Sequence, residues 1–163
     1  MSFDDLLAAN RSYAAHFSLT QFDGLAHAGV AMVTCMDSRL EPLEMIGLKC
    51  GDAKFLRTPG GHVTEDALKG CILGVHLLRV KRILIVPHTR CAMASGTDDQ
   101  IRENIFRASG LDASGVNFGA DPDQLKRLDY DVSLVRDHPL IKGRAEVGGF
   151  MYDVDSGLLT QHC

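Results

Sequence analysis

Residues 30–39 read VAMVTCMDSR, an apolar run that ends in three chemically reactive side chains. The continuous apolar stretch Val30–Thr34 predicts a strand buried on both faces, which is typical of a parallel sheet. Cys35, Asp37 and Arg39 follow it, each separated from the next by one residue. Side chains two positions apart in an extended loop can face the same way, so we expect Cys35 and Asp37 to share one side.

A second apolar run ends in a similar way. Residues 82–86 predict a strand that stops at Pro87, and His88 and Cys91 come directly after it, with His88 53 positions beyond Cys35. In open sheets of parallel strands, ligands collect outside the carboxyl ends of the strands. We therefore expect the two strand ends to form a single site.

The rest of the chain alternates between helical and extended patterns. We predict helices over 3–17 and 42–48, from Thr64 onward, from Thr97 to Gly110, and from Asp121 towards His138, and further strands over 53–57, 145–154 and 158–160. Such alternation implies a mostly parallel central sheet with helices on both faces. The predicted fold class is α/β, with an N-terminal helix and a C-terminal hairpin.

Local signals mark several of these boundaries. Thr64 can cap one helix, and Thr97 with Gln100 forms a capping box for the next. We expect Asp121 to cap the last predicted helix. In the loop after residues 53–57, Gly60 and Gly61 permit backbone angles or a close approach that side chains would forbid.

Length and composition restrict the partners. The chain has 163 residues, 45% of them apolar, which suits a single domain spanning 1–163. Its net charge is -4 with no basic cluster, so we expect no nucleic-acid partner. Apolar stretches fall well short of the roughly 20 residues that cross a bilayer, which predicts a soluble cytoplasmic protein without membrane contact. The apolar stripe of helix 3–17 must dock on its own domain or on a neighbouring subunit; both alternatives stay open.

Five cysteines are an odd number without framework spacing, so free or metal-bound thiols are expected rather than disulfides. Cys71 is expected in the core, and Cys50 and Cys163 have no evident partner in the sequence. Two cysteines and a histidine, Cys35, His88 and Cys91, suit zinc. Asp37 can supply a fourth ligand or a hydrogen bond to bound water, and Arg39 is placed to clamp its carboxylate.

The pattern Cys35-x-Asp37-x-Arg39 followed by His88-x-x-Cys91 resembles the zinc signature of the beta-class carbonic anhydrases, most closely the short bacterial members. The resemblance implies Zn²⁺ held by Cys35, His88 and Cys91, with water in the fourth position, or Asp37 there in a closed state. It implies reversible hydration of carbon dioxide to bicarbonate and a proton through a zinc-bound hydroxide, the carbonate dehydratase reaction, with Asp37 and Arg39 as catalytic residues. Family members are dimers or dimers of dimers, so a homo-oligomer is expected.

The sequence departs from the family pattern around the substrate. Ala92 stands where glycine commonly follows the second cysteine, Thr58-Pro59 replaces Asn-Ala, and no glutamine precedes Cys35 in the loop. If position 92 needs a positive φ, alanine would cost up to about 1 kcal/mol there. His62 is the one histidine expected on a loop near the site, where it could carry protons.

Two other functions use the same residues. The zinc hydroxide could attack carbonyl sulfide or carbon disulfide instead of carbon dioxide. Alternatively, Cys35, Asp37, His88 and Cys91 could close a four-ligand structural zinc site without catalysis.

Overall fold

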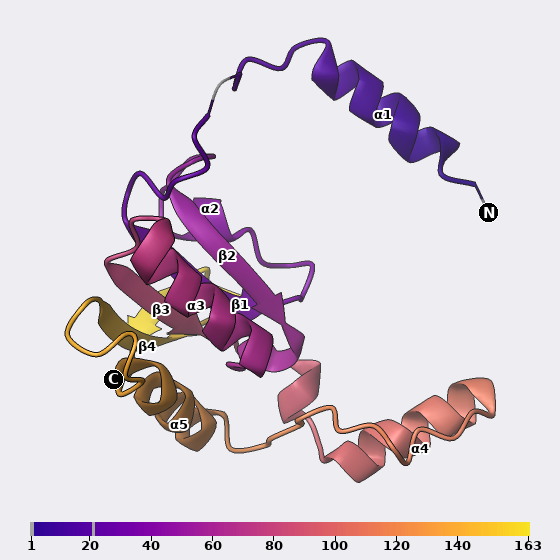
Figure 1. Ribbon diagram of the computed structural model, residues 1–163. Helices are drawn as coiled ribbons and strands as arrows, with labels where there is room; N and C mark the ends of the chain where they lie inside the picture. Colours follow the sequence, from indigo (N-terminus) through magenta and orange to yellow (C-terminus); the bar gives the residue numbers. More distant parts are fainter. Residues whose placement is uncertain (1, 21) are drawn as a thin grey trace.

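The computed structural model describes residues 2–20 and 22–163. Its sheet has the order β2-β1-β3-β4-β5, in which the first four strands are parallel and β5 is antiparallel to β4 (Figure 1). The strands are β1 (Val30–Cys35), β2 (Ala53–Thr58), β3 (Arg82–Val86), β4 (Glu146–Tyr152) and β5 (Leu159–Gln161). The predicted α/β class, with a mostly parallel sheet and a C-terminal hairpin, is confirmed.

The helices are α1 (Asp4–Ala14), α2 (Pro42–Met45), α3 (Glu65–Leu77), α4 (Asp98–Ser109) and α5 (Gln124–Arg136), with short 3-10 turns η1 (Pro59–Gly61) and η2 (Ala92–Ala94). The caps predicted at Thr64 and Thr97 are confirmed, since each side chain accepts a backbone N–H of its own helix. The cap predicted at Asp121 is wrong, because it is the Asp123 carboxylate that accepts the Lys126 N–H. Helix α2 is shorter than 42–48, because Gly47 takes a positive φ of 66°.

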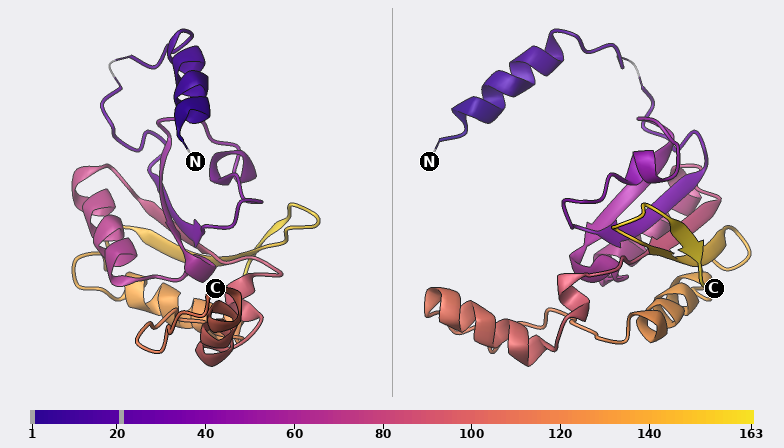
Figure 2. Two further views of the ribbon diagram at one scale, coloured as in Figure 1. Left: turned by 90° about the vertical axis from the view of Figure 1, so that its right-hand side faces the viewer. Right: turned by 180° about the vertical axis from the view of Figure 1, so that it is seen from behind.

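Strand β1 is the centre of the fold. All six of its residues are buried, as its continuous apolar sequence predicted. Ala31 and Val33 of β1 and Ile83 and Ile85 of β3 form one hydrophobic cluster with apolar residues of α3 and α5. Helices α3 and α5 lie on one side of the sheet and the short α2 on the other (Figure 2). Burial on both faces explains why β1 carries no alternation of polar and apolar residues.

Helices α1 and α4 project away from the sheet, as Figure 1 shows. Neither helix has a buried residue. On α1 and just before it, Phe3 is 75% exposed and Leu6 is 62% exposed. Helix α1 therefore does not dock on its own sheet, and it ends at Ala14 instead of residue 17. Within 2–20 and 22–163, every helix is too short or too polar to span a membrane.

Candidate metal centre

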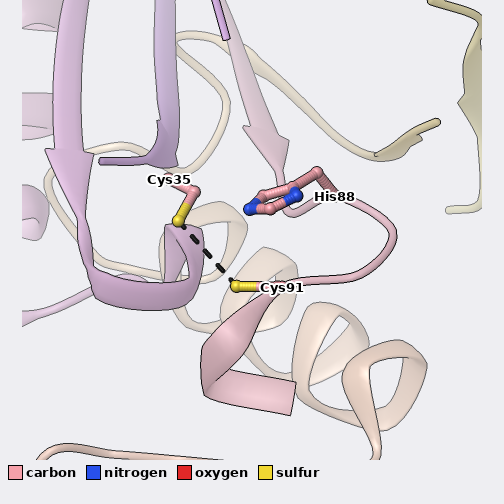
Figure 3. Close-up of side chains that lie close together, drawn as sticks. All are labelled: Cys35, His88 and Cys91. Atoms are coloured by element: carbon pink, nitrogen blue, oxygen red, sulfur yellow. Dashed lines mark hydrogen bonds between the residues drawn. The ribbon is translucent and has the colours of Figure 1, made fainter. Parts of the chain in front are cut away.

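The site lies where β1 and β3 end. The two strands are parallel neighbours, with Thr34 of β1 opposite Val86 of β3. Cys35 is the last residue of β1, and the Cys35 Sγ lies 3.9 Å from the Cys91 Sγ, with the His88 ring beside them (Figure 3). The possible ligand atoms of these three buried residues all lie within 4.8 Å of one another. The structure thus brings together the two strand ends that the sequence placed in one site.

The donor set fits a tetrahedral zinc ion. Two sulfurs bound to Zn²⁺ at about 2.3 Å lie about 3.8 Å apart, close to the spacing of the two cysteines. The His88 Nδ1–H donates to the Thr89 carbonyl at 2.8 Å, which leaves Nε2 with a free lone pair. Within the described ranges, His88 Nε2 is the only buried side-chain nitrogen or oxygen without a hydrogen-bond partner. An unsatisfied buried group costs about 1–3 kcal/mol, which coordination to a metal would remove.

Electrostatics in the cluster favour a deprotonated Cys35 sulfur. The Cys91 thiol donates a hydrogen bond to that sulfur, and this bond lowers the pKa of Cys35 and raises the pKa of Cys91. Burial lowers the pKa of His88, but the contact with Cys35, the hydrogen bond to the Thr89 backbone and the charge of Asp37 together raise it overall. A thiolate is the form of cysteine that binds metals.

Arg39 holds Asp37 beside the cluster. The Arg39 Nε and Nη2 donate to the two Asp37 carboxylate oxygens at 2.9 and 2.8 Å, and the Arg39 backbone N–H donates to Oδ1 at 2.9 Å. These bonds hold the pKa of Asp37 well below its usual range. Asp37 Oδ2 lies 3.7 Å from His88 Nε2. The carboxylate is therefore near the ligand atoms while its own oxygens are occupied by Arg39.

Gly61 packs closely against the ends of both strands. Gly60 and Gly61 have φ angles of 73° and 72°. A Cβ at Gly61 would lie 3.1 Å from both the Cys35 backbone N and the Val86 carbonyl oxygen. The close approach expected of this glycine pair is confirmed.

Arg57 also contacts the site, although the sequence did not mark it as a site residue. Its guanidinium donates to the carbonyl oxygen of Cys35 at 3.0 Å and to that of Asp37. Arg57 lies opposite Thr34 in the register of β2 with β1, which directs it along the loop after β1. The sequence feature that could have pointed to Arg57 is its charge near the end of an otherwise mostly apolar strand.

A cavity of about 430 Å³ opens at the site, lined in part by Asp37, Arg39 and Arg90. Arg90 was also missed; it has a φ of 53°, its carbonyl accepts an Arg39 N–H at 3.2 Å, and its side chain pairs with Asp155. Ala92 begins η2 and is not among the residues of positive φ. The alanine therefore carries no backbone strain, and the left-handed residue of this loop is Arg90.

His62 lies on the loop after η1, as expected, but its side chain is buried. Its side chain lines a small hollow with Arg127 and Asp131, and Gln124 borders both this hollow and the larger cavity. Burial, and then the charge of Arg127, lower the pKa of His62. The histidine lies near the site but outside the lining of the larger cavity.

Comparisons with known proteins agree with this geometry. A family profile described as "Carbonic anhydrase" matches residues 30–110. A crystal structure of carbonic anhydrase from Streptococcus mutans superposes with a TM-score of 0.87 at 31% identity, over 99% of this chain and 98% of that one. "Beta-carbonic anhydrase 1" of Mycobacterium tuberculosis is 29% identical over 158 residues, 97% of this chain and 96% of the relative.

A second kind of relative shares the similarity. A "Carbon disulfide hydrolase" of Acidithiobacillus thiooxidans is 28% identical over 158 residues, covering 82% of this chain and 72% of the relative. The similarity to the carbonic anhydrases covers more of the chain, including both halves of the split cysteine and histidine pattern. The chain belongs to the beta-carbonic anhydrase family of enzymes, as its paired motifs predicted.

Proposed function

We propose that this protein is a zinc-dependent carbonic anhydrase that catalyses the reversible hydration of carbon dioxide to bicarbonate and a proton. The geometry of the cluster carries the proposal. The three buried residues Cys35, His88 and Cys91 converge, and His88 Nε2 has no hydrogen-bond partner. Arg39 meanwhile holds Asp37 by both carboxylate oxygens. This arrangement supports three protein ligands and a fourth position for water, which is typical of catalytic zinc sites.

Each residue then has a role. Cys35, His88 and Cys91 would hold Zn²⁺, which when bound lowers the pKa of water from 15.7 to about 7 and so supplies hydroxide near neutral pH. The ionised Asp37 would accept a hydrogen bond from the reacting hydroxyl and orient it. Arg39 would keep Asp37 ionised and in place, and Arg57 would fix the backbone that carries both Cys35 and Asp37.

Stopped-flow hydration of carbon dioxide by the zinc-loaded protein tests the proposal. We expect activity that rises with pH, and a large loss of activity in Asp37→Asn with zinc content unchanged. Asp52→Asn is the matched control, because Asp52 caps a turn away from the cavity by accepting the Lys49 N–H. Inactivity of the zinc-loaded protein at both neutral and alkaline pH would contradict the proposal.

Hydrolysis of carbon disulfide or carbonyl sulfide is the second candidate, and the Acidithiobacillus thiooxidans relative is the observation that favours it. The same three ligands and the same Asp37 would serve, since only the electrophile changes. Release of hydrogen sulfide from either compound, measured beside carbon dioxide hydration on one protein sample, separates the two functions. Sulfide release without hydration would establish the second function in place of the first.

A structural, non-catalytic zinc site would need Asp37 as its fourth ligand. The three hydrogen bonds from Arg39 to the Asp37 carboxylate support the catalytic alternative, because ligation would have to break at least part of this pairing. X-ray absorption of the zinc-loaded protein reports the ligand set. A shell of two sulfurs, one nitrogen and one carboxylate oxygen at every pH would favour the structural site.

We also propose that the chain works as a homodimer or a dimer of dimers. Helix α1 and the residue before it expose Phe3, Leu6 and Leu7, an apolar surface that a second copy could cover. Leu6→Glu should weaken association measured by light scattering, while Ser12→Glu, which adds the same charge on the other side of α1, should not. Equal masses for both variants and the unmodified chain would contradict this role of α1. The expectations of a cytoplasmic location and of no nucleic-acid partner stay predictions.

A further inference from the structure

A second group of metal-ligating side chains lies where α5 meets the C-terminal strand. Asp129 of α5 and His162 and Cys163 after β5 bring their possible ligand atoms within 4.8 Å of one another. His162 Nε2 lies 3.3 Å from Asp129 Oδ1. None of the three belongs to the cluster formed by Cys35, His88 and Cys91. The sequence assigned no partner to Cys163, because Asp129 is distant from it along the chain.

Backbone pairing holds this segment in place. The Gly149 N–H of β4 donates to the Cys163 carbonyl at 2.7 Å, and the His162 N–H donates to the Gly149 carbonyl at 2.8 Å. These bonds continue the antiparallel pairing of β4 and β5 beyond Gln161. The sheet therefore positions the backbone of His162 and Cys163.

Gly149 also provides the space that the Cys163 sulfur occupies. A Cβ at position 149 would lie 2.7 Å from the Cys163 Sγ and 2.9 Å from Val132 Cγ2 of α5. Real Cβ atoms essentially never come this close to another atom, so a side chain at 149 would displace the sulfur. The glycine allows the thiol to pack between β4 and α5, beside Asp129.

The geometry points to a second binding site for a divalent transition metal such as Zn²⁺, formed by Asp129, His162 and Cys163. Sulfur, imidazole nitrogen and carboxylate oxygen are all zinc ligands, and neighbouring ligands of a tetrahedral zinc ion lie about 3.3–3.8 Å apart. The His162 and Asp129 atoms already have this separation. The thiolate and imidazole favour zinc over magnesium or calcium, which prefer oxygen ligands.

The proposed site lies at the protein surface, where its side chains can move and solvent can reach a bound ion. The Asp129 and His162 side chains are 58% and 33% exposed, so small rotations can close them on an ion and solvent can supply the fourth ligand. A bound ion would tie α5 to the segment after β5, and it would stabilise the folded chain by mass action. The site is independent of the proposed catalysis, because its residues line neither the cavity nor the first cluster.

Zinc stoichiometry of the full chain tests the site. Metal-free protein titrated with Zn²⁺ in a calorimeter should bind two equivalents per chain, and His162→Gln or Cys163→Ser should bind one. The matched controls His16→Gln and Cys50→Ser each remove an exposed residue of the same type and should keep two equivalents. Far-UV circular dichroism checks that all four variants are folded.

A second measurement reports on Cys163 directly. Zinc should slow the reaction of Cys163 with a maleimide, followed by mass spectrometry, and should leave the rate at Cys50 unchanged. One equivalent of zinc in the unmodified chain that stays at one in the His162→Gln and Cys163→Ser variants, two equivalents in these variants, or equal labelling of Cys163 with and without zinc would each overturn the site. A protein without carbon dioxide hydration would still give these stoichiometries, so failure of the proposed function and failure of this site are distinguishable.

Discussion

Replacing Gly61 with alanine should damage the site more than any comparable change at a turn. Gly61 has a φ of 72°, and its missing Cβ would lie 3.1 Å from the Cys35 backbone N and the Val86 carbonyl and 3.3 Å from the Pro87 Cα. All three neighbours are backbone atoms of the strand ends that carry Cys35 and His88. Relief of the contact therefore requires η1 and those strand ends to move apart.

The expected magnitude has two parts. Left-handed backbone costs an alanine about 1–2 kcal/mol. Crowding against well-packed backbone adds about 1–3 kcal/mol, by analogy with overpacked cores, which makes a total of about 2–5 kcal/mol. For a chain of this length, about 2–4 °C in Tm per kcal/mol gives a decrease of about 4–20 °C.

Gly110→Ala is the matched control. Gly110 ends α4 with a φ of 74° and has no atom within 4 Å of the position of a Cβ, so only the first part applies there. Thermal unfolding of both metal-free variants at one concentration measures the difference, and we expect Gly61→Ala to melt lower. It should also bind zinc about 10–100-fold more weakly, as when other supports of a metal ligand are lost. Equal Tm values for the two variants, or unchanged zinc affinity in Gly61→Ala, would refute the reasoning.

Three further predictions concern the same site. Arg39→Gln should free Asp37 and lower the rate of carbon dioxide hydration about 10–100-fold. Arg39→Lys keeps the positive charge but not the paired hydrogen bonds of the guanidinium, so its rate should lie between those of Arg39→Gln and the unmodified protein. A stopped-flow rate of Arg39→Gln equal to that of the unmodified protein would contradict this role of Arg39. Burial lowers the pKa of His62, so below about pH 6.5 the unfolded chain binds a proton that the folded chain does not. The free energy of unfolding, measured in urea, should consequently decrease as the pH is lowered through that range. A His62→Asn variant whose free energy of unfolding depends on pH as steeply as that of the unmodified protein would argue against this role of His62. Zinc at 1,000 times its Kd should add about 4.1 kcal/mol of stability, which chelation or Cys35→Ser should remove in calorimetric melting; a chelator without effect on Tm would count against the metal site.

Most of the fold could be predicted because its signals are local. The apolar run of β1, the stop of β3 at Pro87 and the caps at Thr64 and Thr97 depend on residues within a few positions of one another. The predicted cap at Asp121 failed because two aspartates flank Pro122, and only contacts with the next turn select Asp123. The length of α2 failed because Gly47 adopts a positive φ.

The candidate site divides in the same way. Cys35, Asp37 and Arg39 are close in sequence, and their family pattern with His88 and Cys91 was visible without a structure. Arg57 and Arg90 were not visible as site residues, because their contacts depend on strand register and loop conformation. The same holds for the burial of His62, which follows from packing around α5.

The sequence by itself determined the α/β class, the strand ends that carry the chemistry, and the family. These follow from periodicity, from caps, and from residue types whose spacing is set along the chain. Only the tertiary structure decided that Gly61 packs against the ends of β1 and β3, that α1 leaves its apolar side uncovered, and that Asp129 lies beside His162 and Cys163. The physical reason is that these contacts join segments distant in sequence, and their geometry depends on how the whole sheet and its helices pack.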